Sequence, residues 1–240
     1  MNEIEELQSL IDSAQNIVFF GGAGVSTESG IKDFRSKDGL YQLQSKYGVP
    51  YETILSHTYY KLHTDTFFKF YREFMIVPSA KPNPAHLYLA KLENRKHLTV
   101  ITQNIDGLHQ KAGSRNVIEL HGSIHRNHCE RCHEFYSLED ILMMSGTPKC
   151  PHCGGTIKPD VVLYEEGLDY NDIENALDAL SKADLLIVAG TSLAVYPAAS
   201  FINYFNGDNI VVINKTHTPI NRKVKLEINK PVGEIFSQLK

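Results

Sequence analysis

The stretch Asn16-Ile-Val-Phe-Phe20, continued by Gly21-Gly-Ala-Gly-Val-Ser-Thr27, decides the fold of this chain. Its first part is a short apolar run that predicts a buried strand, and its second part is a glycine-rich turn. Such a turn presents bare backbone amides, and the start of a following helix, to a pyrophosphate. Thr27 occupies the third glycine position of the dinucleotide-binding pattern, so the turn alone is equally compatible with a tight strand-to-helix connection.

The segments around this stretch repeat the same alternation. Residues 3–15 predict an amphipathic helix, because Ile4, Leu7 and Ile11 fall on one helical face. Three later apolar runs, separated by helix-length segments, are expected as parallel strands at 98–102, 183–189 and 209–213. The pattern predicts an α/β fold with a Rossmann-like, doubly wound parallel sheet.

The four cysteines form two Cys-x-x-Cys pairs, Cys129/Cys132 and Cys150/Cys153. Zn²⁺ takes four thiolates at tetrahedral corners, and a two-residue gap lets one turn deliver two sulfurs to one ion. All four ligands would be protein side chains, so we expect a structural zinc. The alternatives are disulfide pairing and a histidine in place of one thiolate, for which the neighbouring candidates are His128, His133 and His152.

Two segments interrupt the alternating pattern and are expected to form a smaller, inserted lobe. They are a helical, tyrosine- and phenylalanine-rich insertion at about 41–79 and the zinc module at about 125–155. The large Rossmann-like lobe would then consist of about 1–40, 80–124 and 156–240, with the whole chain 1–240 forming a single domain.

Charge and hydropathy exclude several classes of function. A net charge of −4 and a pI near 6.3 give no basic footprint for nucleic acid, so no direct nucleic-acid binding is expected. The longest apolar runs are far too short to cross a bilayer, and the acidic residues 1–6 lack the basic region of a signal peptide. We expect a cytoplasmic protein that does not associate with membranes.

The glycine turn continues as Gly22-Ala-Gly-Val-Ser-Thr-Glu-Ser-Gly-Ile-Lys-Asp-Phe-Arg35, which resembles the NAD-binding signature of the sirtuins, the NAD-dependent protein lysine deacylases. Further motifs follow in the family's order: Gln103-Asn-Ile-Asp106, Leu120-His-Gly122, the four cysteines, Lys158-Pro-Asp-Val-Val162, Gly190-Thr-Ser-Leu-Ala-Val195 and Ile213-Asn214. The resemblance implies a single catalytic domain of sirtuin type, with NAD as co-substrate and an acyl-lysine protein or peptide as substrate.

The resemblance also implies the residues that bind NAD. In the glycine turn and the mobile cofactor loop they are Gly22, Ala23, Gly24, Thr27, Asp33, Phe34 and Arg35. Around the nicotinamide and its ribose they are Gln103, Asn104, Ile105, Asp106 and His121, and towards the phosphates and the adenosine they are Gly190, Thr191, Ser192, Asn214 and Val232. Phe34 would shield the reactive ribose carbon from water, because an oxocarbenium-like centre would otherwise hydrolyse.

Catalytic roles implied by the resemblance fall on His121, the general base, and on Asn104. An imidazole that titrates near neutrality can take a proton from a ribose hydroxyl. Without the family resemblance, His121 would be only one of eleven histidines, and a lone histidine is more often a buried polar residue than a catalyst.

Substrate binding is implied for Val162, Tyr164 and Val195. They belong to segments 162–166 and 193–195, between which sirtuins clamp an extended peptide by strand addition. Three positions depart from the family's pattern: Glu165 stands where glycine is usual, Lys32 where proline is usual, and Pro231 where an acidic residue is commoner. Glu165 puts the approach of a peptide backbone in doubt.

The implied reaction is acyl transfer from lysine to ADP-ribose with release of nicotinamide. Mono-ADP-ribosyl transfer to protein is the alternative, which Glu165 and Lys32 keep open. A non-catalytic zinc-dependent interaction module and a dehydrogenase are two further alternatives, and the intact Asn104, Asp106 and His121 argue against the first of these. The segment Phe68-Lys69-Phe70-Tyr71 lacks the Tyr-x-x-Arg pair of succinyl-selective sirtuins, which predicts a preference for neutral acyl groups.

Overall fold

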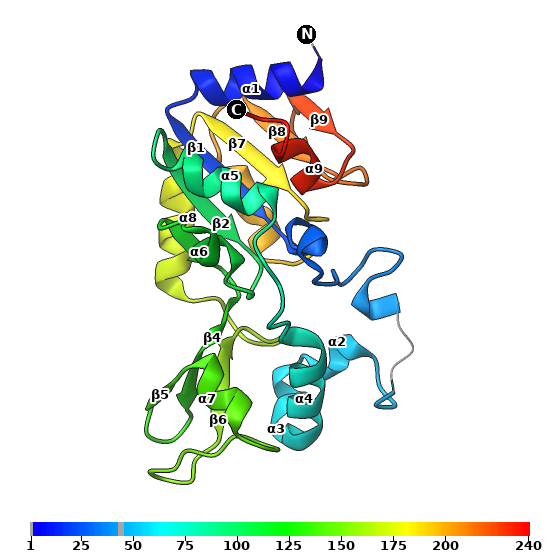
Figure 1. Ribbon diagram of the computed structural model, residues 1–240, viewed down its shortest axis with the longest axis vertical. Helices are drawn as coiled ribbons and strands as arrows, with labels where there is room; N and C mark the ends of the chain where they lie inside the picture. The colour runs from blue at the N-terminus through cyan, green and yellow to red at the C-terminus, as the bar shows by residue number, and fades with distance from the viewer. Residues whose placement is uncertain (1, 43–45) are drawn as a thin grey trace.

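The computed structural model describes residues 2–42 and 46–240, and Figure 1 shows them arranged as two lobes. The larger lobe contains a parallel sheet with the strand order β3-β2-β1-β7-β8-β9. Its strands are β1 (Asn16–Gly21), β2 (His97–Thr102), β3 (Val117–Glu119), β7 (Leu185–Ala189), β8 (Ile210–Ile213) and β9 (Leu226–Ile228). The chain order reverses at β1, since β2 and β3 lie on one side of it and β7 to β9 on the other.

Alternate side chains of β1 explain why both faces of this sheet are covered. Ile17 and Phe19 pack into one buried cluster, and Val18 and Phe20 pack into another. The first cluster is closed by α1 (Glu3–Ser13), α5 (Pro84–Leu92) and α9 (Val232–Phe236), and the second by α8 (Tyr170–Lys182) and the 3-10 helix η5 (Ala198–Tyr204). The result is the doubly wound, Rossmann-like arrangement that the alternating sequence predicts, with α6 (Leu108–Ala112) beside α5.

The smaller lobe combines a three-stranded antiparallel sheet with a group of short helices (Figure 1). The sheet order is β5-β4-β6, with β4 (Gly122–Cys129), β5 (Phe135–Tyr136) and β6 (Ile157–Val161), and α7 (Leu138–Met143) lies beside it. The helices are α2 (Tyr51–Ile54), α3 (His57–Leu62), α4 (Thr64–Phe70) and the π-helical turn η4 (Tyr71–Met75). Their aromatic side chains form a buried cluster that includes Phe67, Phe68 and Tyr71.

The structure confirms the expected strands within a few residues and corrects the expectation of a helix after the glycine turn. The glycine turn is followed by two 3-10 turns, η1 (Ala23–Val25) and η2 (Thr27–Ser29), and the described residues 22–42 contain no α-helix. A further strand, β9, follows the expected strand at 209–213 and was not predicted. The sequence also gave no sign of β3 or of the small antiparallel sheet, whose strands are short. Residues 43–45 of the expected helical insertion lie outside the described residues.

None of the helices in the described residues combines the length and the apolar character that crossing a membrane requires.

Candidate functional site

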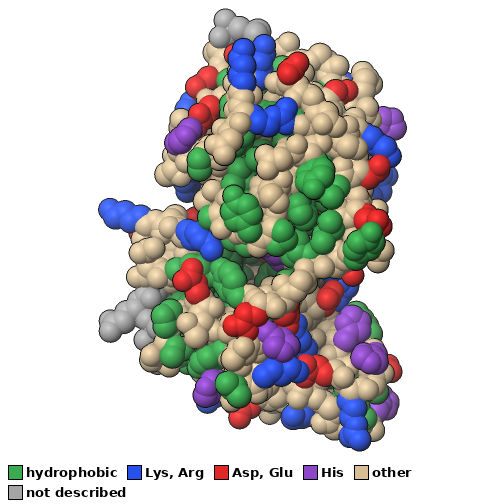
Figure 2. Space-filling view, turned by 180° about the vertical axis from the view of Figure 1, so that it is seen from behind, with side chains coloured by type: hydrophobic (Ala, Val, Ile, Leu, Met, Phe, Trp, Pro, Cys, Tyr) green, Lys and Arg blue, Asp and Glu red, His purple; other side chains and the backbone are tan. Residues whose placement is uncertain are grey.

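A cavity of about 540 Å³ lies at the carboxyl ends of β1, β2 and β7, beside the smaller lobe. Figure 2 shows the corresponding hollow, with hydrophobic side chains gathered around it. Every residue predicted to bind NAD or the substrate lines this cavity, including His121, Asn214, Val232 and Tyr164. Its position agrees with the rule that open α/β sheets bind ligands where the strand order reverses.

Two glycine-containing turns form the floor of the cavity between β1 and β7. The amide of Gly24 donates to the carbonyl of Gly190 at 2.8 Å. A Cβ on Gly24 would lie 2.8 Å from that carbonyl oxygen, and one on Gly190, whose φ is +58°, would lie 2.4 Å from the amide nitrogen of Val25. Only glycine therefore permits this backbone contact, and tight packing of the two turns explains why no regular helix begins there.

A network of three polar side chains lies at one end of the cavity. Asn104 donates through Nδ2 to Ser26 Oγ at 3.1 Å, and Ser26 Oγ donates to Asp106 Oδ2 at 2.7 Å. The other carboxylate oxygen, Oδ1, accepts from the amide of Leu108 at 2.9 Å. The chain of bonds fixes the amide of Asn104 and the carboxylate of Asp106 relative to each other. Ser26 was not among the predicted site residues, although it lies inside the glycine signature.

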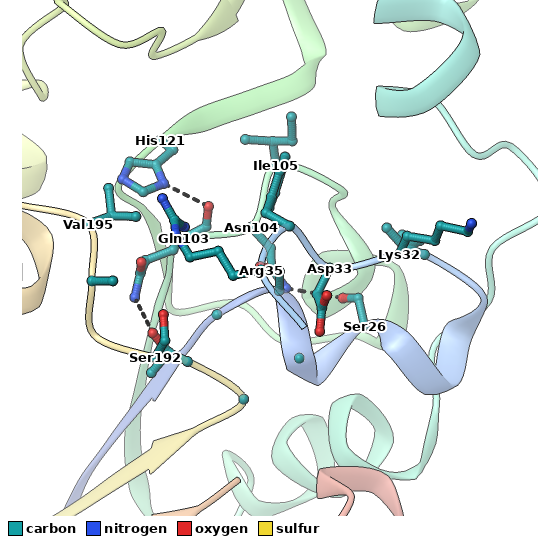
Figure 3. Close-up of a pocket in the computed structure, with 18 of the residues that line it drawn as sticks. Ser26, Lys32, Asp33, Arg35, Gln103, Asn104, Ile105, His121, Ser192 and Val195 are labelled. Atoms are coloured by element: carbon teal, nitrogen blue, oxygen red, sulfur yellow. Dashed lines mark hydrogen bonds between the residues drawn. The ribbon is translucent and has the colours of Figure 1, made fainter. Parts of the chain in front are cut away.

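His121 lies between β3 and β4, where the larger lobe passes into the smaller one. Its Nδ1 is 2.9 Å from the carbonyl oxygen of Gln103, which assigns the hydrogen to Nδ1 and leaves Nε2 as an acceptor (Figure 3). Burial lowers the pKa of His121, and the hydrogen bond to Gln103 opposes this only in part. The ring is therefore neutral near pH 7, which is the state that a general base requires.

The cofactor loop is docked onto the predicted substrate segment. Arg35 donates to the hydroxyl of Tyr164 at 3.0 Å, and the hydroxyls of Tyr41 and Tyr164 are 3.1 Å apart. The ring of Phe34 packs on Tyr41 with 5.3 Å between their centroids. Burial, together with the Tyr164 hydrogen bond, raises the pKa of Tyr41 above its ordinary value. Lys32, at the position where proline was expected, extends away from His121 (Figure 3).

Glu165 stands where the family usually has glycine, and its conformation bears on how a peptide backbone can approach. Its φ is +76°, the left-handed conformation that glycine adopts without strain. The carboxylate accepts from the amide of Thr58 in the first turn of α3 at 2.8 Å. On the same segment, Tyr164 donates its amide to Leu55 and accepts from the amide of His57. The backbone thus has a conformation that a glycine would adopt readily, and the side chain is held against α3.

The opposite end of the cavity is organised by Asn214. Its Nδ2 donates to the carbonyl of Thr191 at 3.1 Å and to the hydroxyl of Thr218 at 2.8 Å. Gln103 Nε2 donates to Thr191 Oγ1 at 3.2 Å, which ties this end to the segment before Asn104. Val232, the first residue of α9, completes this part of the wall.

None of the four residues of the predicted acyl-recognition segment, 68–71, lines the cavity. Phe68 and Tyr71 are buried in the aromatic cluster and do not line it, whereas Phe74 and Met75, one turn later, do. Sequence reasoning missed these two side chains because the π-helical turn η4 shifts which residues face inward.

The four cysteines come together in the smaller lobe, away from the cavity. All four sulfurs lie within 4.8 Å of one another, and the closest pairs are 3.4 to 3.6 Å apart. These distances exclude disulfides and resemble the roughly 3.8 Å that tetrahedral Zn–S bonds of about 2.3 Å imply. Within the described part of the chain, no histidine belongs to this cluster. The donor set therefore fits one structural zinc ion.

Comparisons with known proteins agree with this geometry. A model of the Sir2 family matches residues 22–197. The chain is 54% identical over 238 residues to an NAD-dependent protein deacetylase of Clostridium acetobutylicum. This alignment covers 98% of this chain and 97% of that protein. It is 53% identical over 240 residues to the Clostridium perfringens protein of the same name, with 99% and 98% covered.

Solved structures of Sir2 proteins resemble the whole chain. One contains a deacetylated p53 peptide and 3′-O-acetyl-ADP-ribose and superimposes with a TM-score of 0.88 at 38% identity, covering 98% of this chain and 96% of that one. Another, a complex with a p53 peptide and NAD⁺, gives a TM-score of 0.86 at 37% identity, with 99% and 97% covered. Since the family match spans both glycine turns and the relatives align over nearly the full length, this chain belongs to the Sir2 family.

Proposed function

We propose that the chain is an NAD-dependent protein lysine deacylase that transfers the acyl group to ADP-ribose and releases nicotinamide. The observation that carries the proposal is that one cavity contains both glycine turns, the Asn104–Ser26–Asp106 network and a neutral His121. The names of the curated relatives, and the NAD⁺, peptide and acetyl-ADP-ribose in related structures, support it.

The polar network has the chemistry needed to hold a nicotinamide group. The Asp106 carboxylate can accept hydrogen bonds from a carboxamide NH₂, and Ser26 keeps that carboxylate oriented. The amides of the two glycine turns suit the pyrophosphate, and Asn214 and Val232 form the adenosine end. When bound, NAD supplies a ribose carbon that becomes electrophilic as nicotinamide departs.

His121 and the cofactor loop would perform the remaining steps. His121 Nε2 is the free acceptor that can take a proton from a ribose hydroxyl, and Asn104 is fixed beside it by Ser26. Phe34 and Tyr41, whose rings pack on each other at a tilt in the docked loop, exclude water from the reacting carbon. The acyl-lysine would lie between Tyr164 and Val195, with its peptide paired between segments 162–166 and 193–195.

Several accompanying assignments are also proposals. We propose one catalytic domain over 1–240, with a large lobe of about 1–40, 80–124 and 156–240 and a small lobe of about 41–79 and 125–155. A protein with four free cysteines poised for zinc fits a reducing compartment, so we propose that it works in the cytoplasm. We propose acyl-lysine proteins or peptides as partners.

Mono-ADP-ribosyl transfer is less well supported. Its case rested on Glu165 and Lys32, and the side chain of Glu165 is held against α3 by its bond to Thr58. The names of the curated relatives favour deacylation over this alternative.

The test is to mix the protein with NAD and an acetyl-lysine peptide and to follow both nicotinamide and the mass of the peptide. Deacylation predicts nicotinamide release matched by loss of the acetyl group. A peptide that gains ADP-ribose instead would support the alternative, and no nicotinamide release at all would contradict both. The same mixture without NAD is the control.

A further inference from the structure

The helix α9 begins at the cavity without a cap of its own. Its N-cap residue is Pro231, which has an extended backbone, φ −58° and ψ 140°, but no side-chain hydrogen bond. An N-cap side chain normally accepts from the amide of the second or third helical residue, and in α9 the second residue is Gly233. Proline carries no acceptor on its side chain, so it cannot take that role.

Glu28, more than two hundred residues earlier in the chain, takes the place of the missing cap. Its Oε2 accepts from the amide of Gly233 at 2.5 Å. A Cβ on Gly233 would lie 2.8 Å from the same oxygen, so the carboxylate approaches this closely only because the residue is glycine. The negative charge also lies at the positive end of the helix.

The two partners of this contact each lie next to a residue that lines the cavity. Glu28 follows directly after Thr27, which lines the cavity with the glycine turn, and Gly233 follows Val232, which lines the adenosine end. The described residues that line the cavity do not include Glu28 itself. At the other end of α9, Phe236 packs on Phe19 with 5.9 Å between ring centroids. The core therefore anchors α9 through Val232, Ile235 and Phe236, and Glu28 adds a polar contact at the first turn.

We propose that Glu28 is a positioning residue for the dinucleotide: it caps α9 from the side of the glycine turn and so holds Val232 in the position that the adenosine half requires. This inference rests on the proposed function, because it takes NAD as the ligand. Glu28 acts through α9 and not through contact with the ligand. Its loss should weaken the binding of NAD while leaving the chemistry at His121 intact.

The experiment compares the steady-state kinetics of Glu28→Ala, Glu28→Gln and the wild type. Glu28→Ala should raise KM for NAD about fivefold, with kcat and KM for the peptide within about twofold of wild type. Glu28→Gln keeps an acceptor without the charge, so its KM for NAD should lie between those of the wild type and Glu28→Ala. It also provides the test if the alanine variant folds poorly. Glu234→Gln, which removes an exposed carboxylate from the same helix, is the matched control and should leave KM for NAD unchanged.

A rescue variant separates this role from a general loss of stability. Pro231→Asp supplies a local N-cap, so in the Glu28→Ala background it should restore KM for NAD, whereas in the wild-type background it should change little. The proposal would be overturned if KM for NAD were unchanged in both Glu28 variants, or if kcat fell by the same factor as KM for NAD rose. Failure of Pro231→Asp to restore KM for NAD would overturn it as well. If the wild type released no nicotinamide, the proposed function would be wrong, and calorimetric binding of ADP-ribose to the same variants would still decide the role of Glu28.

Discussion

Glu165 shows how a side chain can offset a backbone conformation that its own Cβ disfavours. It adopts φ +76°, and its carboxylate caps the first turn of α3 through Thr58. The strain and the cap act in opposite directions on the stability of the segment that would receive the peptide.

Two substitutions separate these effects. Glu165→Gly removes the strain together with the cap and should leave the melting temperature nearly unchanged. Glu165→Ala keeps the strain without the cap and should lower it by a few degrees. Glu174→Ala, at an exposed position on α8, is the control. Equal melting temperatures for the alanine and glycine variants would show that the left-handed backbone costs nothing here.

His121 should determine the acid limb of the activity profile. Because burial lowers its pKa, the neutral ring persists below the ordinary histidine value of about 6.5, and protonation removes the base only at lower pH. We therefore expect kcat/KM to stay level as the pH falls through about 6.5 and to decline below it. A decline centred above that value would contradict the assignment.

His121→Ala should retain NAD binding and lose about 10²- to 10⁴-fold in rate.

At the scale of elements, the zinc module links metal binding to the integrity of the smaller lobe. Cys129 and Cys150 are buried, and the hydroxyl of Tyr136 lies 3.1 Å from Cys150 Sγ, a contact that lowers the pKa of this thiol to about 6. A thiol with a lowered pKa gives up its proton to a metal more readily. The thiols thus lie in a small buried cluster with Tyr136, Ile141 and Ile157.

Removal of the metal with a chelator, or Cys150→Ser, should lower the melting temperature and the deacylase activity together, because the lobe unfolds around its missing ion. His152→Ala changes an exposed neighbour outside the cluster and should have neither effect. A metal-free protein that kept both its melting temperature and its activity would refute the structural role of zinc.

The helix α4 and the turn η4 bear on acyl selectivity. Lys69 is exposed, and Arg72 donates to the backbone carbonyls of Met144 and Gly146 in the zinc module. Neither cation lines the cavity, where this segment contributes only Phe74 and Met75. A dicarboxylic acyl group would meet apolar side chains here, with its charge unpaired.

We therefore expect neutral acyl groups to be preferred, with kcat/KM for an acetyl-lysine peptide about tenfold or more above that for the succinyl form. The butyryl form of the same peptide matches the succinyl chain in length without its charge and should be accepted. Faster removal of succinyl than of butyryl groups would contradict this placement of α4 and η4.

At the scale of the whole molecule, the parts that were predictable are those encoded locally. The strand at 16–20 and its glycine turn, the Cys-x-x-Cys pairs and the polar residues after β2 each depend on a few adjacent residues, and their places in the fold follow from strand order. The short strands β3 and β9 carry too few residues for a periodic signal. Their existence depends on neighbouring strands that pair with them.

Contacts between distant segments were the part that the sequence could not predict. Ser26 joins Asn104 to Asp106, Tyr164 joins the cofactor loop to the substrate segment, and Glu28 reaches α9. Each contact joins segments that lie far apart in the chain, so it forms only once the fold has brought them together. The site is therefore a property of the assembled molecule, although its individual motifs are local.

The fate of the acyl group tests the central claim most directly. A peptide bearing ¹³C-labelled acetyl-lysine, incubated with the protein and NAD, should transfer the label to ADP-ribose in amounts equal to the nicotinamide released, and His121→Ala should abolish that transfer. Label recovered as free acetate without nicotinamide release, or ADP-ribose attached to a peptide that keeps its label, would contradict the account.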